Sequence, residues 1–350
     1  MGLQPDLPPA ALRLVIDRDA LAANWRALDA MSGAARTGAA VKADAYGIGA
    51  SVAVPVLRDA GCRDFFVTYA HEAGDIVGLV PPAEVSILHG PINEGVAVWA
   101  RETGVRVVIN SLEQAARWLA AGGGRCDLMV DTGINRLGLP LTDLGDPLIA
   151  RLDVDVLMSH LASADEDVAL NAKQRAQWEE ARHMVPHFRA SLANSAGIAL
   201  GGAYHGDLTR PGLSLYGGVP RSEMEGRIAQ VARPMAAVMQ VRQIAAGEGV
   251  GYNATYIAPA PMRVGVVALG YADGFLRSWS GGKGVLLWQG RKLPVLGRVS
   301  MDMIDVDLAG ADDVREGDWL EVEYALPSAS TACGLSQYEL LTLLGNRFAR

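Results

Sequence analysis

The chain carries its most informative segment at residues 39–49, which read AAVKADAYGIG. An apolar run of β-strand character ends at Lys42, and small residues then lead to Tyr46 and Gly47, a pattern typical of a turn. A lysine with apolar neighbours is partly desolvated, which disfavours the ammonium and lowers its pKa. Such an amine forms a Schiff base with a carbonyl cofactor. The alternative is a lysine that ends a buried strand and keeps its ammonium in solvent.

The strand that ends at Lys42 is the first of a series. From about residue 37 to residue 215, short apolar runs alternate with helical stretches. One stretch, residues 111–121, is amphipathic and begins with a serine suited to capping a helix. Eight strands that alternate with helices imply a parallel sheet, and eight is the number that closes a barrel. The predicted strands are residues 38–41, 65–68, 85–88, 105–109, 128–131, 154–158, 188–193 and 204–208.

The sequence therefore predicts an α/β fold: a (β/α)8 TIM-type barrel over residues 1–228, followed by a mostly antiparallel β domain over residues 229–350. In the second part, apolar and polar residues alternate with period two, as at Met239 and Val241 or at Ile304 and Val306. Further features are turn signals at 246–249, 289–290 and 316–318, a short helix at about 336–344, and an early strand at about 13–17. That early strand either precedes the barrel strands or pairs with the second domain.

The composition excludes several classes of function. A formal net charge of −8 and a pI near 5.3 argue against a nucleic-acid-binding surface. No apolar run approaches the roughly 20 residues of a membrane helix, and residues 1–10 lack the pattern of a secretory signal. Cys62, Cys126 and Cys333 are far apart, which argues against a disulfide framework or a zinc site. We therefore expect a cytoplasmic protein that acts on a small molecule, without a metal, a membrane or a nucleic-acid partner.

Polar residues follow five of the predicted barrel strands. In a barrel of this kind the carboxyl ends of the strands face the active site, and phosphate often binds after strands seven and eight. Each residue by itself also has an explanation as a turn or a cap, but five equivalent positions predict one shared site. They are Lys42 after the first strand, residues 131–136 after the fifth, His160 after the sixth, Asn194 and Ser195 after the seventh, and Arg210 after the eighth.

Six segments carry a resemblance to a known family. Besides residues 39–49 they are 193–197 (ANSAG), 209–217 (TRPGLSLYG), 251–256 (GYNATY), 269–274 (LGYADG) and 297–302 (GRVSMD). In this order, over about residues 15–347, they resemble the motifs of the alanine racemase family. The resemblance implies a homodimer with pyridoxal 5'-phosphate as cofactor. The implied reaction is the racemisation of L-alanine to D-alanine and back through a Schiff base of that cofactor.

The resemblance also implies roles for residues of the barrel. Lys42 would bind the cofactor and act as the base on one face of the substrate. Arg210 would face the pyridine nitrogen without donating a proton, because a guanidinium pKa stays above about 12. His160 would hydrogen-bond and orient Arg210; its alternative is a buried core histidine. The residues expected to contact the cofactor are Lys42, Tyr46, Arg136, His160, Asn194, Ser195, Arg210, Gly212 and Leu213.

A second base is expected from the β domain. Inversion of a stereocentre needs one base on each face, and the resemblance implies that Tyr252 of the partner subunit serves the face opposite Lys42. A free tyrosine titrates near about 10, so it needs positive neighbours to work near neutrality. A hairpin tyrosine that packs across strands is the alternative. The residues expected to border the substrate are Arg136, Tyr271, Met301 and Asp302.

Three departures from the family pattern concern this site. Met129 stands where the family commonly has a lysine modified as a carbamate, so a thioether replaces the group that positions Arg136. We expect Arg136 to keep its place, steadied by a bound anion, a carboxylate or water; the alternative is that it turns away. A tyrosine that usually follows the arginine-rich C-terminal segment is missing, which would widen the entrance. Asp44 and Ile48 replace an asparagine and a histidine of the lysine motif.

Other functions share parts of this pattern. A racemase of broader specificity, acting also on serine and other small side chains, is the nearest alternative, because the size of a pocket is not visible in a sequence. A pyridoxal-phosphate carrier would lack the β domain. A decarboxylase of the same fold would place a cysteine where residues 300–302 read SMD. A role in supplying D-alanine for the cell wall and a role in alanine breakdown both stay open.

Overall fold

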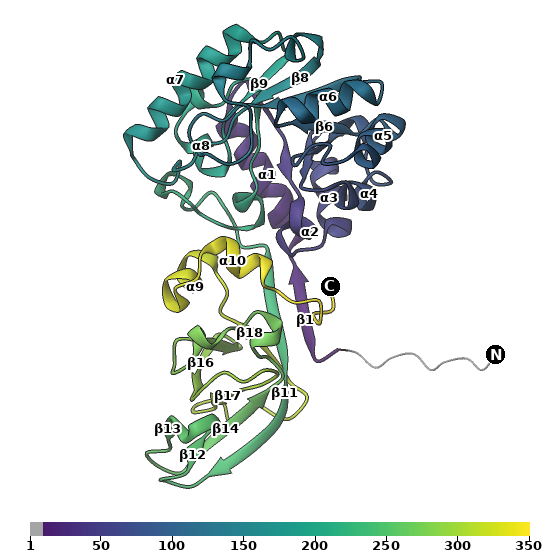
Figure 1. Cartoon of the computed structure of the whole chain (residues 1–350). Helices are drawn as coiled ribbons and strands as arrows, with labels where there is room; N and C mark the ends of the chain where they lie inside the picture. Colours follow the sequence, from purple (N-terminus) through teal and green to yellow (C-terminus); the bar gives the residue numbers. More distant parts are fainter. Residues whose placement is uncertain (1–9) are drawn as a thin grey trace, which may run out of the picture. The chain divides into compact units, whose positions relative to one another are not determined.

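The computed structural model describes residues 10–350, which divide into two compact units (Figure 1). One unit is Arg18–Ala229. The other consists of two segments, the described residues before Arg18 and Gln230–Arg350. Each unit has its own sheets. Residues 1–9, on which the expectation of a missing secretory signal rests, lie outside the described part of the chain.

The unit Arg18–Ala229 is a ring of parallel strands. Seven strands pair in the order β3-β4-β5-β6-β7-β8-β9, and β10 pairs in parallel with β2. The N–H of Arg210, just after β10, donates to the carbonyl of Ala193, just after β9, at 2.9 Å. These contacts close the sheet on itself and confirm the predicted barrel. The strands are β2 (Arg36–Thr37), β3 (Ala39–Ala40), β4 (Phe65–Val67), β5 (Val85–Ile87), β6 (Arg106–Ile109), β7 (Arg125–Met129), β8 (Asp153–Met158), β9 (Arg189–Ser191) and β10 (Leu208–Thr209).

The observed barrel strands begin or end one or more residues from their predicted bounds, and two of these differences have a clear structural cause. The predicted strand 38–41 is shorter in the structure: only Ala39–Ala40 forms β3, and the separate strand β2 (Arg36–Thr37) precedes it, because the chain changes partner at Gly38. The N–H of Gly38 donates to the carbonyl of Thr209, whereas the N–H of Ala39 donates to the carbonyl of Asp64. The eighth strand is Leu208–Thr209 rather than 204–208, because Gly202–Tyr204 forms a 3-10 turn.

Helices cover the outside of the barrel and alternate with its strands (Figure 1). The helix predicted at 111–121 is confirmed as α6: the Oγ of Ser111 accepts the N–H of Gln114 at 3.2 Å, and Ala115 and Trp118 are buried. The helices are α1 (Arg18–Ser32), α3 (Ala50–Ala60), α4 (Ala70–Ile76), α5 (Glu94–Thr103), α6 (Leu112–Ala120), α7 (Ala169–Met184) and α8 (Ser195–Ala199). α2 (Lys42–Tyr46) is a short turn with an unusual backbone.

The barrel interior is filled with apolar side chains, so it is a packed core and not a pore. Burial of these side chains is the main favourable contribution to the stability of the unit. The cluster consists of Phe66, Val108, Met129, Val156, Met158 and Leu208, with Leu88 packed against it.

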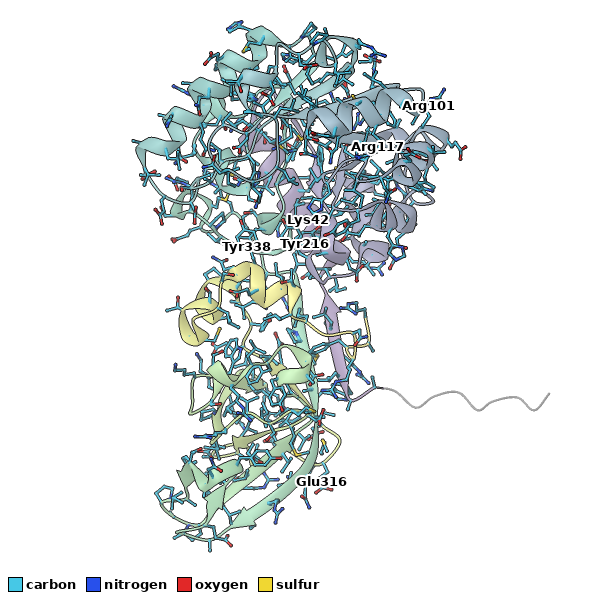
Figure 2. All side chains as sticks on the ribbon, in the orientation of Figure 1. Lys42, Arg101, Arg117, Tyr216, Glu316 and Tyr338 are labelled. Carbon is cyan, nitrogen blue, oxygen red and sulfur yellow. The ribbon has the colours of Figure 1, made fainter. Side chains whose placement is uncertain are left out.

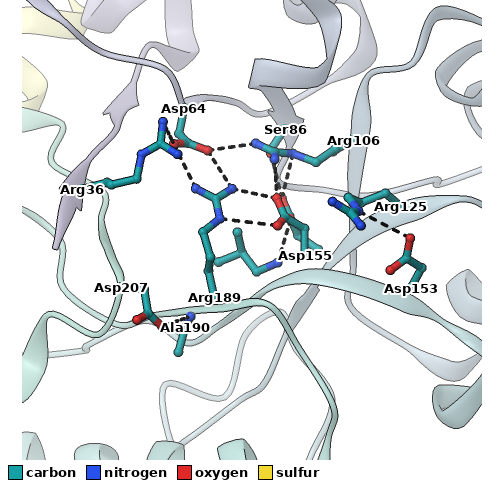
Figure 3. Close-up of polar contacts among 12 residues, drawn as sticks. Arg36, Asp64, Ser86, Arg106, Arg125, Asp153, Asp155, Arg189, Ala190 and Asp207 are labelled. Carbon is teal, nitrogen blue, oxygen red and sulfur yellow. Dashed lines mark hydrogen bonds and ion pairs between the residues drawn. The ribbon is translucent and has the colours of Figure 1, made fainter.

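A buried network of charges closes the amino-terminal end of the barrel (Figure 3). Arg106, at the start of β6, donates to Asp64 at 3.1 Å and also to Asp155. Arg189, at the start of β9, donates to the same two carboxylates at 2.9 Å and 2.7 Å. Removing one member leaves another charge buried and unpaired, so this network is costly to break.

The second unit is an antiparallel sheet. Its strands follow the order β1-β11-β14-β17-β16-β15-β18, and β18 pairs back onto β11, so most of the sheet closes into a small barrel. The early strand is β1, and it pairs with β11, where Leu14 lies opposite Pro234. The strands are β1 (Leu12–Ile16), β11 (Ala232–Ile244), β12 (Gly249–Val250), β13 (Tyr256–Ile257), β14 (Met262–Val267), β15 (Val285–Trp288), β16 (Arg291–Leu296), β17 (Ile304–Asp307) and β18 (Trp319–Val322).

The predicted alternation holds in β17 but fails in part of β11. Ile304 and Val306 are buried, as predicted. In β11 the pairing register shifts between Val238 and Gln240, and Met239 is 50% exposed. A bulge adds one residue to a strand and turns the following side chains to the other face, which a period-two pattern does not reveal.

Two helices lie near the end of the chain, α9 (Leu326–Cys333) and α10 (Gln337–Thr342). α10 confirms the predicted short helix, and Ser336 and Glu339 form its capping box. None of the helices in residues 10–350 has the length and apolar character that crossing a membrane requires. The three cysteines are buried free thiols.

Replacing Asp64 with asparagine should lower the free energy of unfolding by about 3–5 kcal/mol, because Arg106 and Arg189 lose a charged partner. Burial alone would raise the pKa of Asp64, but the hydrogen bonds and charge of Arg189, and then of Arg106, hold it below its usual value. A carboxyl with a lowered folded-state pKa stabilises the fold above its unfolded value, about 3.9, and this contribution disappears as the pH falls through the folded value. When unfolding by urea is measured below about pH 4, the difference in the free energy of unfolding between wild type and variant should therefore be smaller than at neutral pH.

The matched control is Asp153→Asn. Asp153 and Arg125 form an exposed pair at 3.4 Å in the same barrel, and breaking it should cost less than about 1 kcal/mol. Equal decreases in the free energy of unfolding in the two variants would contradict a stabilising role for the buried network.

Candidate functional site

The residues predicted at the strand ends lie in one unit and at one end of the barrel. All barrel strands are parallel, so the segments that follow them emerge on the side opposite the buried charge network. The structure brings together Lys42 after β3, Arg136 after β7, His160 after β8, Asn194 and Ser195 after β9, and Arg210 after β10.

The turn behind Lys42 has a left-handed backbone. The four residues after Lys42 have φ values of 52° to 57°, so α2 is a turn of left-handed helix. Each such non-glycine residue costs roughly 1–2 kcal/mol, and surrounding contacts have to hold it in place. One contact is local: Asp44 accepts the N–H of Ala50, at the start of α3, at 2.6 Å. The sequence predicted a turn here but not its handedness.

Lys42 is half-buried, and its surroundings favour the neutral amine. Burial is the largest cause that lowers the pKa of Lys42, and the positive charge of Arg136 adds to it, whereas Glu72 acts in the opposite direction. The predicted desolvation of this lysine is thus present in the structure. A lowered pKa increases the fraction of neutral lysine amine, which is the form that attacks a carbonyl group.

Arg136 is exposed and forms no ion pair with any residue in 10–350. The carboxylate that we expected as one way of steadying Arg136 is therefore not found in that part of the chain. Met129 explains why: its side chain packs in the apolar barrel interior, with Met158 opposite it in the neighbouring strand. The charge of Arg136 acts on Lys42 and His160, whose pKa values it lowers.

Tyr46 ends the turn and lies against the segment after Arg210. Its ring stacks on Tyr216, with centroids 5.0 Å apart, and the hydroxyl of Tyr216 donates to the carbonyl of Ala40 at 2.9 Å. Figure 2 shows Tyr216 beside Lys42. A Cβ at Gly212 would lie 2.3 Å from the hydroxyl oxygen of Tyr46, so only glycine lets the backbone approach this closely.

Ser195 is buried and organises the same segment. Its Oγ accepts the N–H of Gly212 at 3.0 Å and the N–H of Ser214 at 3.2 Å. A hydroxyl has two acceptor sites and one proton, so the proton is left to donate elsewhere. Asn194 accepts the N–H of Gly197 at 2.9 Å and caps α8.

Arg210 is buried and held by two serines. Its guanidinium donates to the Oγ of Ser191 and, at 2.5 Å, to the carbonyl of Ser159. Burial lowers the pKa of Arg210 to about 10, below the predicted value, because within residues 10–350 no carboxylate pairs with it. The group stays charged at neutral pH. The expected hydrogen bond with His160 is absent among the described residues, since the serines take its place.

His160 stays uncharged at physiological pH. Burial, followed by the positive charges of Arg210 and Arg136, lowers its pKa to about 3. A neutral imidazole among arginines keeps one donor and one acceptor nitrogen and adds no further positive charge.

Gln174 is a residue that the sequence analysis missed. It is fully buried on α7, where it donates to the carbonyl of His160 at 3.0 Å and accepts the N–H of Ala162 at 2.9 Å. It also donates to Thr132 at 3.4 Å, so it ties together the loops after β7 and β8. Its helical spacing with the buried Trp178 was the available signal, because a glutamine on an apolar helix face needs polar partners.

The remaining predicted residues lie in the second unit. Tyr252 begins a 3-10 turn (Tyr252–Ala254) and is 65% exposed. Tyr271 begins another 3-10 turn, and its N–H donates to the carbonyl of Ser300 at 3.0 Å. A Cβ at Gly270 would lie 2.2 Å from the carbonyl oxygen of Met301, so glycine allows these two segments to meet.

Arg347 anchors the segment that contains Met301 and Asp302. It donates to Asp302 at 2.7 Å and makes a two-pronged contact with the buried Asp273 at 2.6 Å and 2.8 Å. Bidentate arginine–carboxylate contacts are geometrically specific. The C-terminal segment therefore fixes the loop whose Met301 and Asp302 were predicted to border a substrate.

Comparison with known proteins covers both units. Residues 16–220 match the family model described as alanine racemase, N-terminal domain, and residues 231–350 match the model described as alanine racemase, C-terminal domain. The alanine racemase of Methylobacterium nodulans is 42% identical over 357 residues, which are 97% of this chain and 95% of the relative. That of Acidiphilium cryptum is 40% identical over 351 residues, 96% of this chain and 97% of the relative.

Solved structures are similar over nearly the whole chain. The alanine racemase from Bartonella henselae with covalently bound pyridoxal phosphate has a TM-score of 0.90 and 33% identity, and the match covers 98% of this chain and 99% of that one. The biosynthetic alanine racemase from Pseudomonas aeruginosa has a TM-score of 0.87 and 33% identity, covering 97% and 98%.

Replacing Arg136 with glutamine should raise the pKa of Lys42, because the charge of Arg136 lowers it. The neutral amine is the reactive form, so Lys42 should reach its half-maximal modification rate at a higher pH than in the wild type. The protein is first treated with hydroxylamine to remove any carbonyl compound bound to Lys42. The rate of reductive methylation of Lys42 is then measured as a function of pH by peptide mass spectrometry. Arg125→Gln, at the opposite end of β7, should leave the curve unchanged. A curve that moves in both variants, or in neither, contradicts the electrostatic role.

Proposed function

The chain belongs to the alanine racemase family, and we propose that it interconverts L-alanine and D-alanine with pyridoxal 5'-phosphate as its cofactor. The observation that carries the proposal is the meeting of Lys42, Ser195 and Arg210 at one end of a parallel barrel. Lys42 supplies a reactive amine, Ser195 a hydroxyl that donates a hydrogen bond to an anion, and Arg210 a buried positive charge. One solved relative carries the same cofactor covalently, and Lys42 is the lysine at the strand end here.

The residues after β9 and β10 fit the phosphate of the cofactor. Both acceptor sites of the Ser195 hydroxyl are used by backbone N–H groups, so its proton is directed to an incoming oxygen. The Tyr46 hydroxyl lies against Gly212, where a Cβ would clash. We assign the phosphate to Ser195, Tyr46 and the backbone of Gly212 and Leu213, with Asn194 shaping the segment as the cap of α8. The amine of Lys42 would bind the aldehyde.

The charged residues fit the ring of the cofactor. When bound, the cofactor withdraws electrons from the substrate Cα and makes the Cα proton acidic. Arg210 would face the pyridine nitrogen and, with a pKa of about 10, keep its own proton at neutral pH. Electron withdrawal then stays moderate, which suits a simple proton exchange. His160 would stay neutral beside it, and Arg136 would reach the phenolic oxygen.

Two bases on opposite faces would carry out the inversion. Lys42 has a lowered pKa, which favours the neutral Nζ that would take up a proton from one face. We assign the opposite face to the partner subunit's Tyr252, which implies a homodimer. The exposure of Tyr252 in its own unit supports a role at another surface. Met301, Asp302 and Tyr271 would border the substrate, with Asp302 held by Arg347.

We place this activity in the cytoplasm, supported by three buried cysteines that are unpaired. D-alanine made there would serve cell-wall synthesis. The nearest alternative activity, racemisation of serine and other small amino acids, depends on the width of the substrate pocket, and an assay on a panel of L-amino acids separates it from an alanine-specific enzyme.

Purified protein should racemise L-alanine, and borohydride reduction should attach the cofactor to the Lys42 peptide. Lys42→Ala should lower the racemisation rate by at least about 100-fold, because it removes one proton-transfer group and the covalent attachment. Lys173→Ala, an exposed residue on α7, is the control and should keep full activity. Reductive labelling of Lys173 or Lys283 in place of Lys42 would overturn the assignment.

A shared active site should be detectable by complementation. Lys42→Ala and Tyr252→Phe proteins should each be nearly inactive, because each lacks one of the two bases. When the two are mixed and allowed to exchange subunits, a mixed dimer contains one site with both bases, so each mixed dimer should have up to about half of the activity of a wild-type dimer. Refolding them together without any recovery would contradict the role of Tyr252 across an interface.

A further inference from the structure

Glu72 connects two segments that meet behind Lys42. It is the third residue of α4, a position from which glutamate ordinarily caps its own helix. Its Oε2 accepts the N–H of Thr68, just after β4, at 2.6 Å. Its Oε1 accepts the N–H of Ala43, directly after Lys42, at 2.7 Å and across 29 positions of sequence. A cap alone does not require this second bond.

We propose that Glu72 is a positioning residue that clamps the left-handed turn behind Lys42 to the end of β4 and so sets where the Lys42 amine lies. The proposal deepens the function proposed for Lys42 and rests on it.

The turn needs such a clamp because its backbone is unfavourable. Ala43 is the first of four consecutive non-glycine residues with positive φ. Its N–H has no other acceptor among residues 10–350. At the far end of the turn, Asp44 accepts the N–H of Ala50 at 2.6 Å. The turn is therefore held by one carboxylate at each end, and the Glu72 carboxylate acts on the residue next to Lys42.

Glu72 also places a negative charge near the amine. Among residues 10–350 it forms no ion pair. The charged groups that shift the pKa of Lys42 are Arg136 and Glu72, and the charge of Lys42 in turn lowers the pKa values of His89 and His160. Glu72 raises the pKa of Lys42, whereas burial and Arg136 lower it. One carboxylate thus influences both the position and the protonation of the amine.

Three variants separate this role from helix capping. Glu72→Gln keeps the size of the side chain but loses one acceptor oxygen and the charge. Glu72→Asp keeps the charge on a side chain too short to reach both N–H groups. The matched control is Glu339→Gln, because Glu339 is the third residue of α10 and accepts the N–H of Ser336 at 2.8 Å, a local cap only.

The first measurement is amide hydrogen exchange in the protein as purified. In Glu72→Gln and Glu72→Asp, the amides of residues 43–46 should exchange about 10- to 100-fold faster than in the wild type, the effect of losing one charged hydrogen bond. In Glu339→Gln these amides should be unchanged. Unchanged exchange at 43–46 in both Glu72 variants would overturn the clamp.

The second measurement is the pH dependence of Lys42 reductive methylation in protein freed of cofactor. Loss of the negative charge in Glu72→Gln should move the half-maximal rate to lower pH, opposite to Arg136→Gln, whereas Glu72→Asp should stay closer to the wild type. If the pH dependence of Lys42 methylation in Glu72→Gln matches that in the Glu339→Gln control, Glu72 has no electrostatic effect on Lys42, which contradicts this part of the proposal. Borohydride labelling of a different lysine would refute the function proposed for Lys42, and the exchange result would still decide whether the clamp exists.

Discussion

The closure of the parallel strands into one ring is the constraint on which the rest of the barrel unit depends. Parallel strands all end on the same side, so Lys42, His160 and Arg210 meet although they are far apart in the sequence. Closure also forces the inward side chains into a packed apolar core, which leaves the two ends of the barrel as the places for polar chemistry.

The two ends of the barrel manage charge in different ways. At the amino end, Arg106 and Arg189 are paired with buried carboxylates, so the charges largely cancel. At the carboxyl end, Lys42, Arg136 and Arg210 form no ion pairs within residues 10–350. Uncancelled positive charge in this site suits an anionic cofactor, and, after burial, it contributes to keeping His160 neutral. One end is therefore built for stability and the other for binding.

Local patterns carried much of the prediction. The helix start at Ser111, the short helix near the end of the chain and the order of the barrel strands follow from spacing over a few residues, and all appear in the structure. The predictions are wrong where the structure of a segment depends on a partner that is distant in the sequence. The first predicted strand is shorter than 38–41 because the pairing partner of the chain changes at Gly38, and β11 turns Met239 outward at a bulge. The buried charge network was not anticipated, because its residues belong to different strands and no short spacing joins them.

The sequence by itself determined the type of fold, the family motifs and the five strand ends at which polar residues gather, because these depend on periodicity and on residue identity. The tertiary structure alone decided the left-handed turn behind Lys42, the serine partners of Arg210 and the contacts of Gln174 and Glu72. Each of these depends on which backbone N–H or carbonyl group a distant segment presents after the ring has closed. A side chain's partner across 29 positions, as for Glu72 and Ala43, is fixed by packing and not by local preference.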